Sequence, residues 1–130
     1  MTSTPPEPES NIERLLDEAR RRLDRVEPDD LAAEVAAGAL VIDTRPVADR
    51  ERDGELPGAV AVERIHLEWR LDPSSPWKLD GVEADTRAII VCNEGYSSSL
   101  AAATLRQLGL HRATDLAGGY RAWRATRAPS

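Results

Sequence analysis

The chain has 130 residues, of which 41% are hydrophobic and 31% charged, and its formal net charge is −6 at pH 7. These values predict one soluble globular domain and argue against a nucleic-acid partner, because no basic stripe is available to bind phosphates. The single cysteine excludes an internal disulfide and a multi-cysteine metal site, and His66 and His111 are expected at the surface. No apolar run reaches membrane-spanning length and residues 1–10 lack a signal-peptide core, so a cytoplasmic protein without a membrane partner is expected.

Apolar and turn-forming residues predict alternating helices and strands. Residues 1–9 are rich in Pro, Thr and Glu and are expected to form a disordered tail, after which Ser10 and Glu13 match a capping box that begins an amphipathic helix over about 11–25. The later elements, in chain order, are expected to be a helix from Pro28 to near Gly38, a strand at 40–42, a helix at 46–54, a strand at 59–62, a helical piece at 63–70, a strand at 88–91, a helix at 100–108, a strand at 113–116 and a helix after 118–119. Strands separated by helices predict a mainly parallel sheet in a single domain.

The single cysteine, Cys92, directly follows the apolar run 88–91 and precedes a polar loop that leads into the helix expected at 100–108. This order places a thiol at the carboxyl end of a strand, facing the start of a helix, where open α/β sheets bind their ligands. Backbone N–H groups and the helix dipole at such a position stabilise an anion and lower the pKa of a thiol. A lone cysteine is more often an inert buried residue, but this context favours a reactive one.

Several motifs in the chain together resemble those of a single-domain rhodanese, the fold of thiosulfate and related sulfurtransferases. They are Val41–Arg45, similar to the family's strand ending in Asp-x-Arg; Gly54–Ala59, similar to its Gly-His-Ile-Pro-Gly-Ala turn; Ile90–Cys92 with the six-residue loop; Leu108-Gly109; and Leu116–Gly119 with Trp123. The resemblance implies a rhodanese-like α/β domain over 26–127, with a small, mainly parallel sheet, helices on both faces and an extra N-terminal helix at 10–25.

The resemblance also implies a reaction. A Cys92 thiolate attacks the outer sulfur of a sulfane donor to form a persulfide, and a thiol or another nucleophile such as cyanide then takes that sulfur, without a cofactor. The implied substrate-binding loop is Asn93, Glu94, Gly95, Tyr96, Ser97 and Ser98. Asp43 and Arg45 are expected to brace the loop region; the alternative is that they only cap the following helix. The implied partners are a small-molecule or protein-borne sulfur donor and a thiol acceptor, with the chain as a monomer or homodimer.

Three residues depart from the family pattern. Ser97 stands where thiosulfate-using members often have Arg, Glu55 stands where the turn often has His, and Glu94 adds an acid to the loop. The missing cation and the added carboxylate oppose binding of a doubly charged anion. They argue against thiosulfate as the physiological donor and favour a less anionic persulfide. Tyr96 either stacks on the donor or is a plain exposed aromatic.

The sequence also allows other functions. A non-catalytic rhodanese-like binding or regulatory module and a persulfide carrier are the main alternatives to an enzyme. A phosphatase or arsenate reductase of the same fold ranks last, because the oxyanion-clamping Arg of those enzymes is replaced by Ser98. Trp69 is expected in the core and Arg70 in solvent, although either could instead line the rim of the pocket. The N-terminal helix is expected to pack on the core, with dimerisation or partner docking as the other possibility.

Overall fold

The structure is a computed structural model and describes residues 10–127, so the predicted tail at 1–9 lies outside the described residues. Four strands form one sheet in the order β2-β1-β3-β4, and all three pairs are parallel. The strands are β1 (Leu40–Asp43), β2 (Val60–Ala61), β3 (Ala88–Val91) and β4 (Thr114–Asp115). Every residue of β3 is buried because this central strand is covered on both faces, as its unbroken apolar run predicts.

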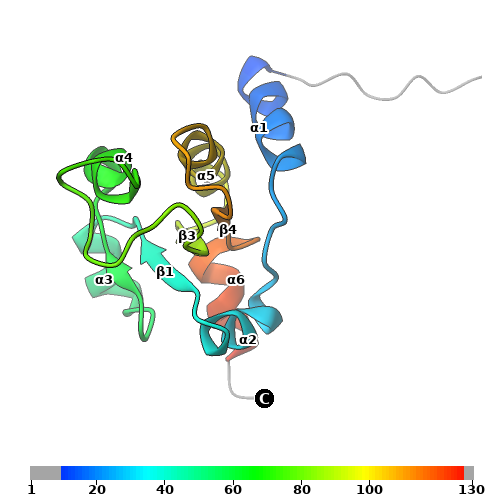
Figure 1. Cartoon of the computed structure of the whole chain (residues 1–130). Coiled ribbons are helices and arrows are strands. Elements are labelled where there is room, and N and C mark those ends of the chain that lie inside the picture. The colour runs from blue at the N-terminus through cyan, green and yellow to red at the C-terminus, as the bar shows by residue number, and fades with distance from the viewer. Residues whose placement is uncertain (1–9, 128–130) are drawn as a thin grey trace, which may run out of the picture.

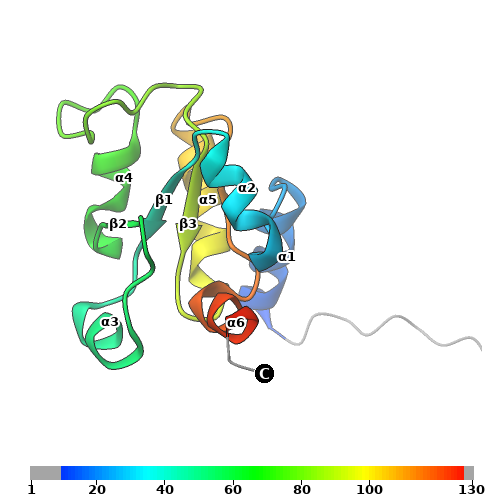
Figure 2. The same cartoon turned by 90° about the horizontal axis from the view of Figure 1, so that it is seen from below.

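Helices cover both faces of the sheet (Figures 1 and 2). They are α1 (Asn11–Arg21), α2 (Leu31–Ala36), α3 (Val47–Asp53), α4 (Leu67–Leu71), α5 (Ser97–Gln107) and α6 (Gly119–Thr126), with short 3₁₀ turns at Pro28–Asp30 and Arg64–His66. Ile42 and Ile90 face the core cluster beneath α4 and α5, whereas Val41 and Ile89 face the cluster beneath α2 and α6. The predicted α/β class, with a parallel sheet between two helical layers, is confirmed.

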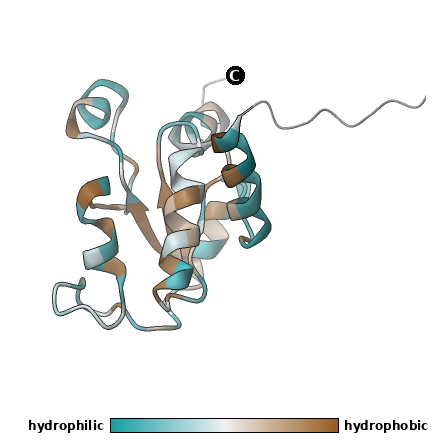
Figure 3. Ribbon diagram, turned by 90° about the horizontal axis from the view of Figure 1, so that it is seen from above, coloured by the Kyte–Doolittle hydropathy of each residue, from teal (hydrophilic) through white to brown (hydrophobic). Residues whose placement is uncertain are grey.

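The strands are hydrophobic and the surrounding helices mix hydrophobic with hydrophilic residues, as Figure 3 shows. This distribution is typical of helices that turn one side to a buried sheet and the other to solvent. Within residues 10–127, no helix is both long and apolar enough to cross a membrane.

Two predicted helix boundaries are wrong, and both corrections matter for the site. The first helix ends at Arg21 rather than near residue 25, because Leu23 turns inward to the core and Val26 pairs with Leu116 in a short parallel bridge. Helix α5 begins at Ser97 rather than Leu100, so the serines expected in the loop form its first turn. The hydroxyls of two of these serines, Ser98 and Ser99, bond the buried Asp115 carboxylate, and this tertiary partner offsets the weak helix propensity of serine.

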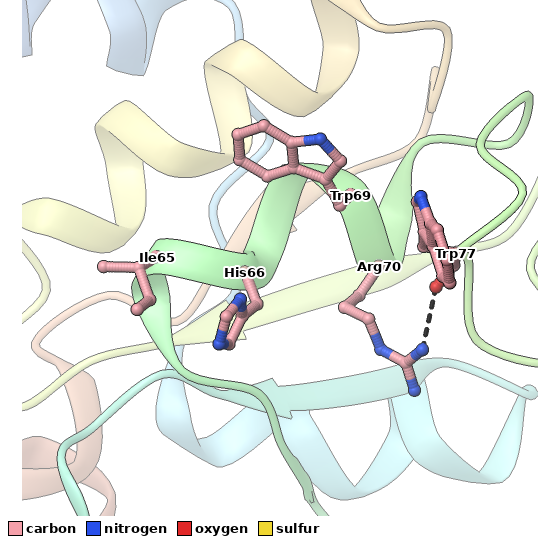
Figure 4. Close-up of a pocket in the computed structure, with 5 residues that line it drawn as sticks. All are labelled: Ile65, His66, Trp69, Arg70 and Trp77. Atoms are coloured by element: carbon pink, nitrogen blue, oxygen red, sulfur yellow. Dashed lines mark hydrogen bonds between the residues drawn. The ribbon is translucent and has the colours of Figure 1, made fainter.

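The expectation that Trp69 lies in the core is also wrong. Leu67 and Leu71 are the buried residues of the short helix α4, and Trp69, halfway between them, is 59% exposed. Arg70 is half-buried and donates a hydrogen bond to the carbonyl of Trp77, as Figure 4 shows. A five-residue helix leaves room for one buried stripe, and the two leucines occupy it.

Candidate active site

Cys92 follows β3 at the carboxyl edge of the sheet, and it is 8% exposed. The Gly95 N–H donates a hydrogen bond to the Cys92 sulfur across 3.2 Å. The loop can fold back in this way because Gly95 has a φ of +85°, a conformation that glycine adopts without penalty. The sequence-based expectation of a thiol between a strand end and a helix start therefore matches the position that the structure gives to Cys92.

The surroundings of Cys92 favour the thiolate. Burial by itself raises the pKa of the thiol, but hydrogen bonds from the hydroxyls of Ser98 and Ser97 and from the N–H groups of Ser98 and Gly95 outweigh it. The net result is a pKa below the ordinary value of a thiol. The Ser98 hydroxyl has a single proton and also lies 2.7 Å from a carboxylate oxygen of Asp115. The sulfur and the carboxylate therefore compete for the same proton.

Gly118 and Gly119, at the start of α6, lie against the backbone of the loop. The N–H groups of Tyr120 and Arg121 donate to the carbonyls of Cys92 (2.9 Å) and Asn93 (3.1 Å). A Cβ on Gly119 would lie 2.6 Å from the Cys92 carbonyl oxygen, closer than real Cβ contacts come. The closing Gly-Gly motif of the sequence thus allows the backbone of α6 to approach the backbone that carries the thiol.

The remaining loop side chains have different environments. Glu94 is half-exposed and pairs at 3.7 Å with Arg121 of α6, and Tyr96 is 58% exposed. Ser97 is exposed at the start of α5. The amide oxygen of Asn93 is buried and has no hydrogen-bond partner among residues 10–127. Among the predicted loop residues, the ones that donate hydrogen bonds to the Cys92 sulfur are Gly95, Ser97 and Ser98.

Asp43 and Arg45 form a buried ion pair, with the Arg45 Nη2 2.8 Å from an Asp43 carboxylate oxygen. Arg45 also donates to the Gly54 carbonyl, and its guanidinium carbon lies 3.7 Å from the centre of the Tyr120 ring. The Tyr120 hydroxyl donates to the backbone carbonyl of Asp53. Among the described residues, α3 begins without a side-chain cap. The pair therefore supports the turn after α3 and the start of α6, and α6 in turn contacts the loop.

Three residues of the site were not found from the sequence: Arg20, Arg25 and Asp115. The buried Asp115 carboxylate accepts hydrogen bonds from Arg25, Ser98 and Ser99. Arg20 and Arg25 both donate to the Gly95 carbonyl, at 2.8 and 3.0 Å. Both arginines stand among residues of alternating charge, a pattern typical of a solvated helix face, yet both are half-buried against the loop. A usable signal was the position of Asp115 at the end of the last strand, on the same sheet edge as Cys92.

Two hollows share the side chain of Ile65, one near Thr44 and one along α4. One, of about 320 Å³, adjoins Thr44, whose hydroxyl donates to the Val91 carbonyl beside Cys92. The other, of about 410 Å³, contains Trp69 and Trp77, and Ile65 lines both hollows (Figure 4). Among residues 10–127, no group of three His, Cys, Asp or Glu side chains is placed to hold a metal ion.

Comparison with known proteins identifies the family. The family model for the rhodanese-like domain matches residues 27–126, and the chain belongs to that family. A solved structure from Rhodopseudomonas palustris, described as a protein of unknown function and possible tyrosine phosphatase, is 31% identical, with 98% of each chain covered and a TM-score of 0.81. Among curated protein sequences, none matches significantly.

Two solved sulfurtransferases are also similar. A human single-domain sulfurtransferase is 24% identical over 80% of this chain and 97% of its own, with a TM-score of 0.66. A thiosulfate sulfurtransferase from Pseudomonas aeruginosa is 25% identical over 82% of this chain but only 19% of its own, with a TM-score of 0.64. The family model begins at residue 27, so α1, Arg20 and Arg25 lie outside it.

Replacing Glu94 with Gln is expected to increase the reactivity of Cys92 only slightly. Removing a carboxylate near a thiolate lowers the pKa of the thiol, but Glu94 is half-exposed and already paired with Arg121, so its field at the sulfur is weak. We expect the rate of alkylation by iodoacetamide at neutral pH to rise by less than about threefold. Arg121→Gln should lower the rate by a similar factor. A tenfold effect of either change would show that Glu94 faces the sulfur directly.

Proposed function

We propose that this protein is a rhodanese-type sulfurtransferase that carries sulfane sulfur as a persulfide on Cys92. The observation that carries the proposal is the placement of the only thiol of the chain, which lies at the head of a loop whose Gly95 N–H points at its sulfur. Family membership and the two similar sulfurtransferases support the same reaction class.

Each half of the reaction is a displacement at sulfur. The Cys92 thiolate attacks the outer sulfur of the donor; a new S–S bond forms, the bond to the donor remnant breaks, and the remnant leaves with the electron pair. A thiolate acceptor then attacks the outer sulfur of the Cys92 persulfide and regenerates the Cys92 thiolate. Donors from Gly95, Ser97 and Ser98 stabilise the negative charge on sulfur at both stages.

A phosphatase is the second candidate, and the description of the Rhodopseudomonas structure favours testing it. Cysteine phosphatases of this fold use an arginine at the end of the loop to hold the phosphate oxygens. The corresponding residue here is Ser98, which is neutral and buried and has its hydroxyl bonded to Asp115. Without that cation a phosphate dianion binds poorly beside a thiolate, so sulfur transfer is the better match.

Turnover with two substrates distinguishes these functions. The protein is incubated with a glutathione persulfide or thiosulfate donor and a thiol or cyanide acceptor, and separately with p-nitrophenyl phosphate. We expect sulfur transfer that is lost in Cys92→Ser, and phosphate release no faster than in that variant. Phosphate release that depends on Cys92, without sulfur transfer, would overturn the proposal in favour of the phosphatase.

Replacing Ser97 with Arg should improve the use of thiosulfate. Ser97 is exposed at the mouth of the loop, and a guanidinium there would offer a fork of donors to a sulfonate group. A charged hydrogen bond in a partly exposed site contributes about 1.5–3 kcal/mol at most, which corresponds to about one to two orders of magnitude in kcat/KM. The gain should appear mainly in KM, because the interaction is made with the bound anion. The loop would not disfavour thiosulfate if the wild-type protein used thiosulfate efficiently and Ser97→Arg left kcat/KM unchanged.

A further inference from the structure

We propose that Arg20 and Arg25, which precede the rhodanese-like domain, are positioning residues that hold the Cys92 loop in its sulfur-binding conformation. The inference rests on the proposed sulfurtransferase function. It assigns to the N-terminal extension a part in the active site that the family match, which begins at residue 27, does not cover.

The two guanidinium groups meet on one atom of the loop. Arg20 Nη2 and Arg25 Nη2 lie 2.8 and 3.0 Å from the carbonyl oxygen of Gly95. Gly95 is also the residue whose N–H reaches the Cys92 sulfur at 3.2 Å. The Ser99 hydroxyl also lies 3.3 Å from this carbonyl, and Gly95 packs against the backbone of Gly118. The two peptide groups of Gly95 are linked through its φ and ψ, so fixing its carbonyl also limits where its N–H can point.

Arg25 and Arg20 also fix the start of α5. Arg25 binds both carboxylate oxygens of Asp115 (2.9 and 3.1 Å), and Asp115 accepts from the hydroxyls of Ser98 and Ser99 at 2.7 Å each. Arg20 Nε donates to the Ser99 hydroxyl at 3.2 Å. Because Arg25 supplies two donors to Asp115, the carboxylate depends less on the proton of Ser98, and that proton becomes available to the Cys92 sulfur.

Apolar packing of α1 is too limited to explain these contacts. Within α1, which is described in full, Ala19 is the one buried residue, and Ile12 and Leu15 are each more than half exposed. The helix lies along α5, where Figure 1 shows the two side by side. Its polar contacts converge on the loop instead: Arg20 also lies over the ring of Tyr96, 5.6 Å from its centroid. Leu23 and Asp24 anchor the segment after α1 to the body of the domain, and the contacts of the extension with the Cys92 loop itself are made by Arg20 and Arg25.

The test measures the reactivity of Cys92 without any sulfur donor. Rates of iodoacetamide alkylation are measured across pH for wild type, Arg20→Ala, Arg25→Ala, Arg25→Lys and the control Arg21→Ala, whose side chain is exposed at the end of the same helix. Each protein is checked for folding by circular dichroism and urea unfolding. If Arg25→Ala does not fold, Arg20→Ala still tests the proposal, because in that variant the buried Asp115 remains paired with Arg25.

We expect Arg20→Ala and Arg25→Ala to shift the alkylation profile to higher pH and to slow alkylation at neutral pH by about tenfold, with Arg21→Ala unchanged. Arg25→Lys should be as stable as wild type, but its alkylation profile should also shift to higher pH. One ammonium group cannot bind both Asp115 oxygens and the Gly95 carbonyl. In sulfur transfer, kcat should fall in these variants more than KM rises. Folded Arg20→Ala and Arg25→Lys proteins with wild-type profiles would overturn the proposal. Shifted profiles in a protein that forms no persulfide would support the arginine contacts and refute the sulfurtransferase.

Discussion

Gly119→Ala is expected to lose sulfur transfer almost completely, by about 100-fold or more in kcat/KM. Gly119 has a φ of +66°, and an added Cβ would lie 2.6 Å from the Cys92 carbonyl oxygen and 2.7 Å from the Asn93 carbonyl group. All of these neighbours are backbone atoms, so the loop itself must move. The hydrogen bond from the Tyr120 N–H to Cys92 would break, and the Gly95 N–H would no longer face the sulfur.

Gly109→Ala is the matched control for that change. Gly109 also has a positive φ (+100°), but no described atom lies within 4 Å of a Cβ built there. It therefore carries the same kind of conformational cost without the overlap. We expect a modest loss of stability and nearly wild-type kcat/KM, measured with the same donor and acceptor. Equal losses in the two variants would mean that backbone strain, and not contact with the Cys92 loop, limits activity.

Asp43→Ala is expected to give the largest loss of stability among the single changes considered, about 3–5 kcal/mol. It leaves the Arg45 guanidinium, fully buried against Tyr120, without its counter-charge. One guanidinium nitrogen of Arg45 already lacks a hydrogen-bond partner within the described chain, so no nearby group can compensate. The free energy of unfolding is measured by urea denaturation of wild type and variant.

Glu55→Ala provides the comparison for the buried pair. It removes a surface ion pair with Arg50, in which the Glu55 side chain is 65% exposed, and such pairs contribute less than about 1 kcal/mol. If Asp43→Ala lowered the free energy of unfolding by a similarly small amount, the Arg45 guanidinium would have to become hydrated when its partner is removed. The ion pair would then not support the turn after α3.

The strands and the nucleophile could be predicted from local sequence. The apolar runs that become β1 and β3 are continuous because both faces of these strands are covered, and Cys92 directly follows the second run. The start of α5 could not be placed by the same means. Serines favour loops unless their hydroxyls have partners, and the partner of Ser98 and Ser99 is Asp115, 16 or more residues away.

The arginine contacts depend on tertiary structure to an even greater degree. Arg20 and Gly95 are 75 residues apart in sequence, and α1 carries charges of both signs that are typical of a solvated helix. Nothing local distinguishes Arg20, which reaches the loop, from Arg21, which is exposed. The difference arises from the direction in which α1 packs along α5, and that direction is set once Leu23 and Val26 have anchored the connecting segment.

Intact-protein mass spectrometry after exposure to a panel of sulfane donors tests the central claim most directly. Wild type is expected to gain the mass of one sulfur atom that dithiothreitol removes, and Cys92→Ser is expected to gain nothing. The gain should occur more readily with uncharged or thiol-borne donors than with thiosulfate. A stable sulfur adduct on Cys92→Ser, or sulfur transfer that persists in that variant, would contradict the account.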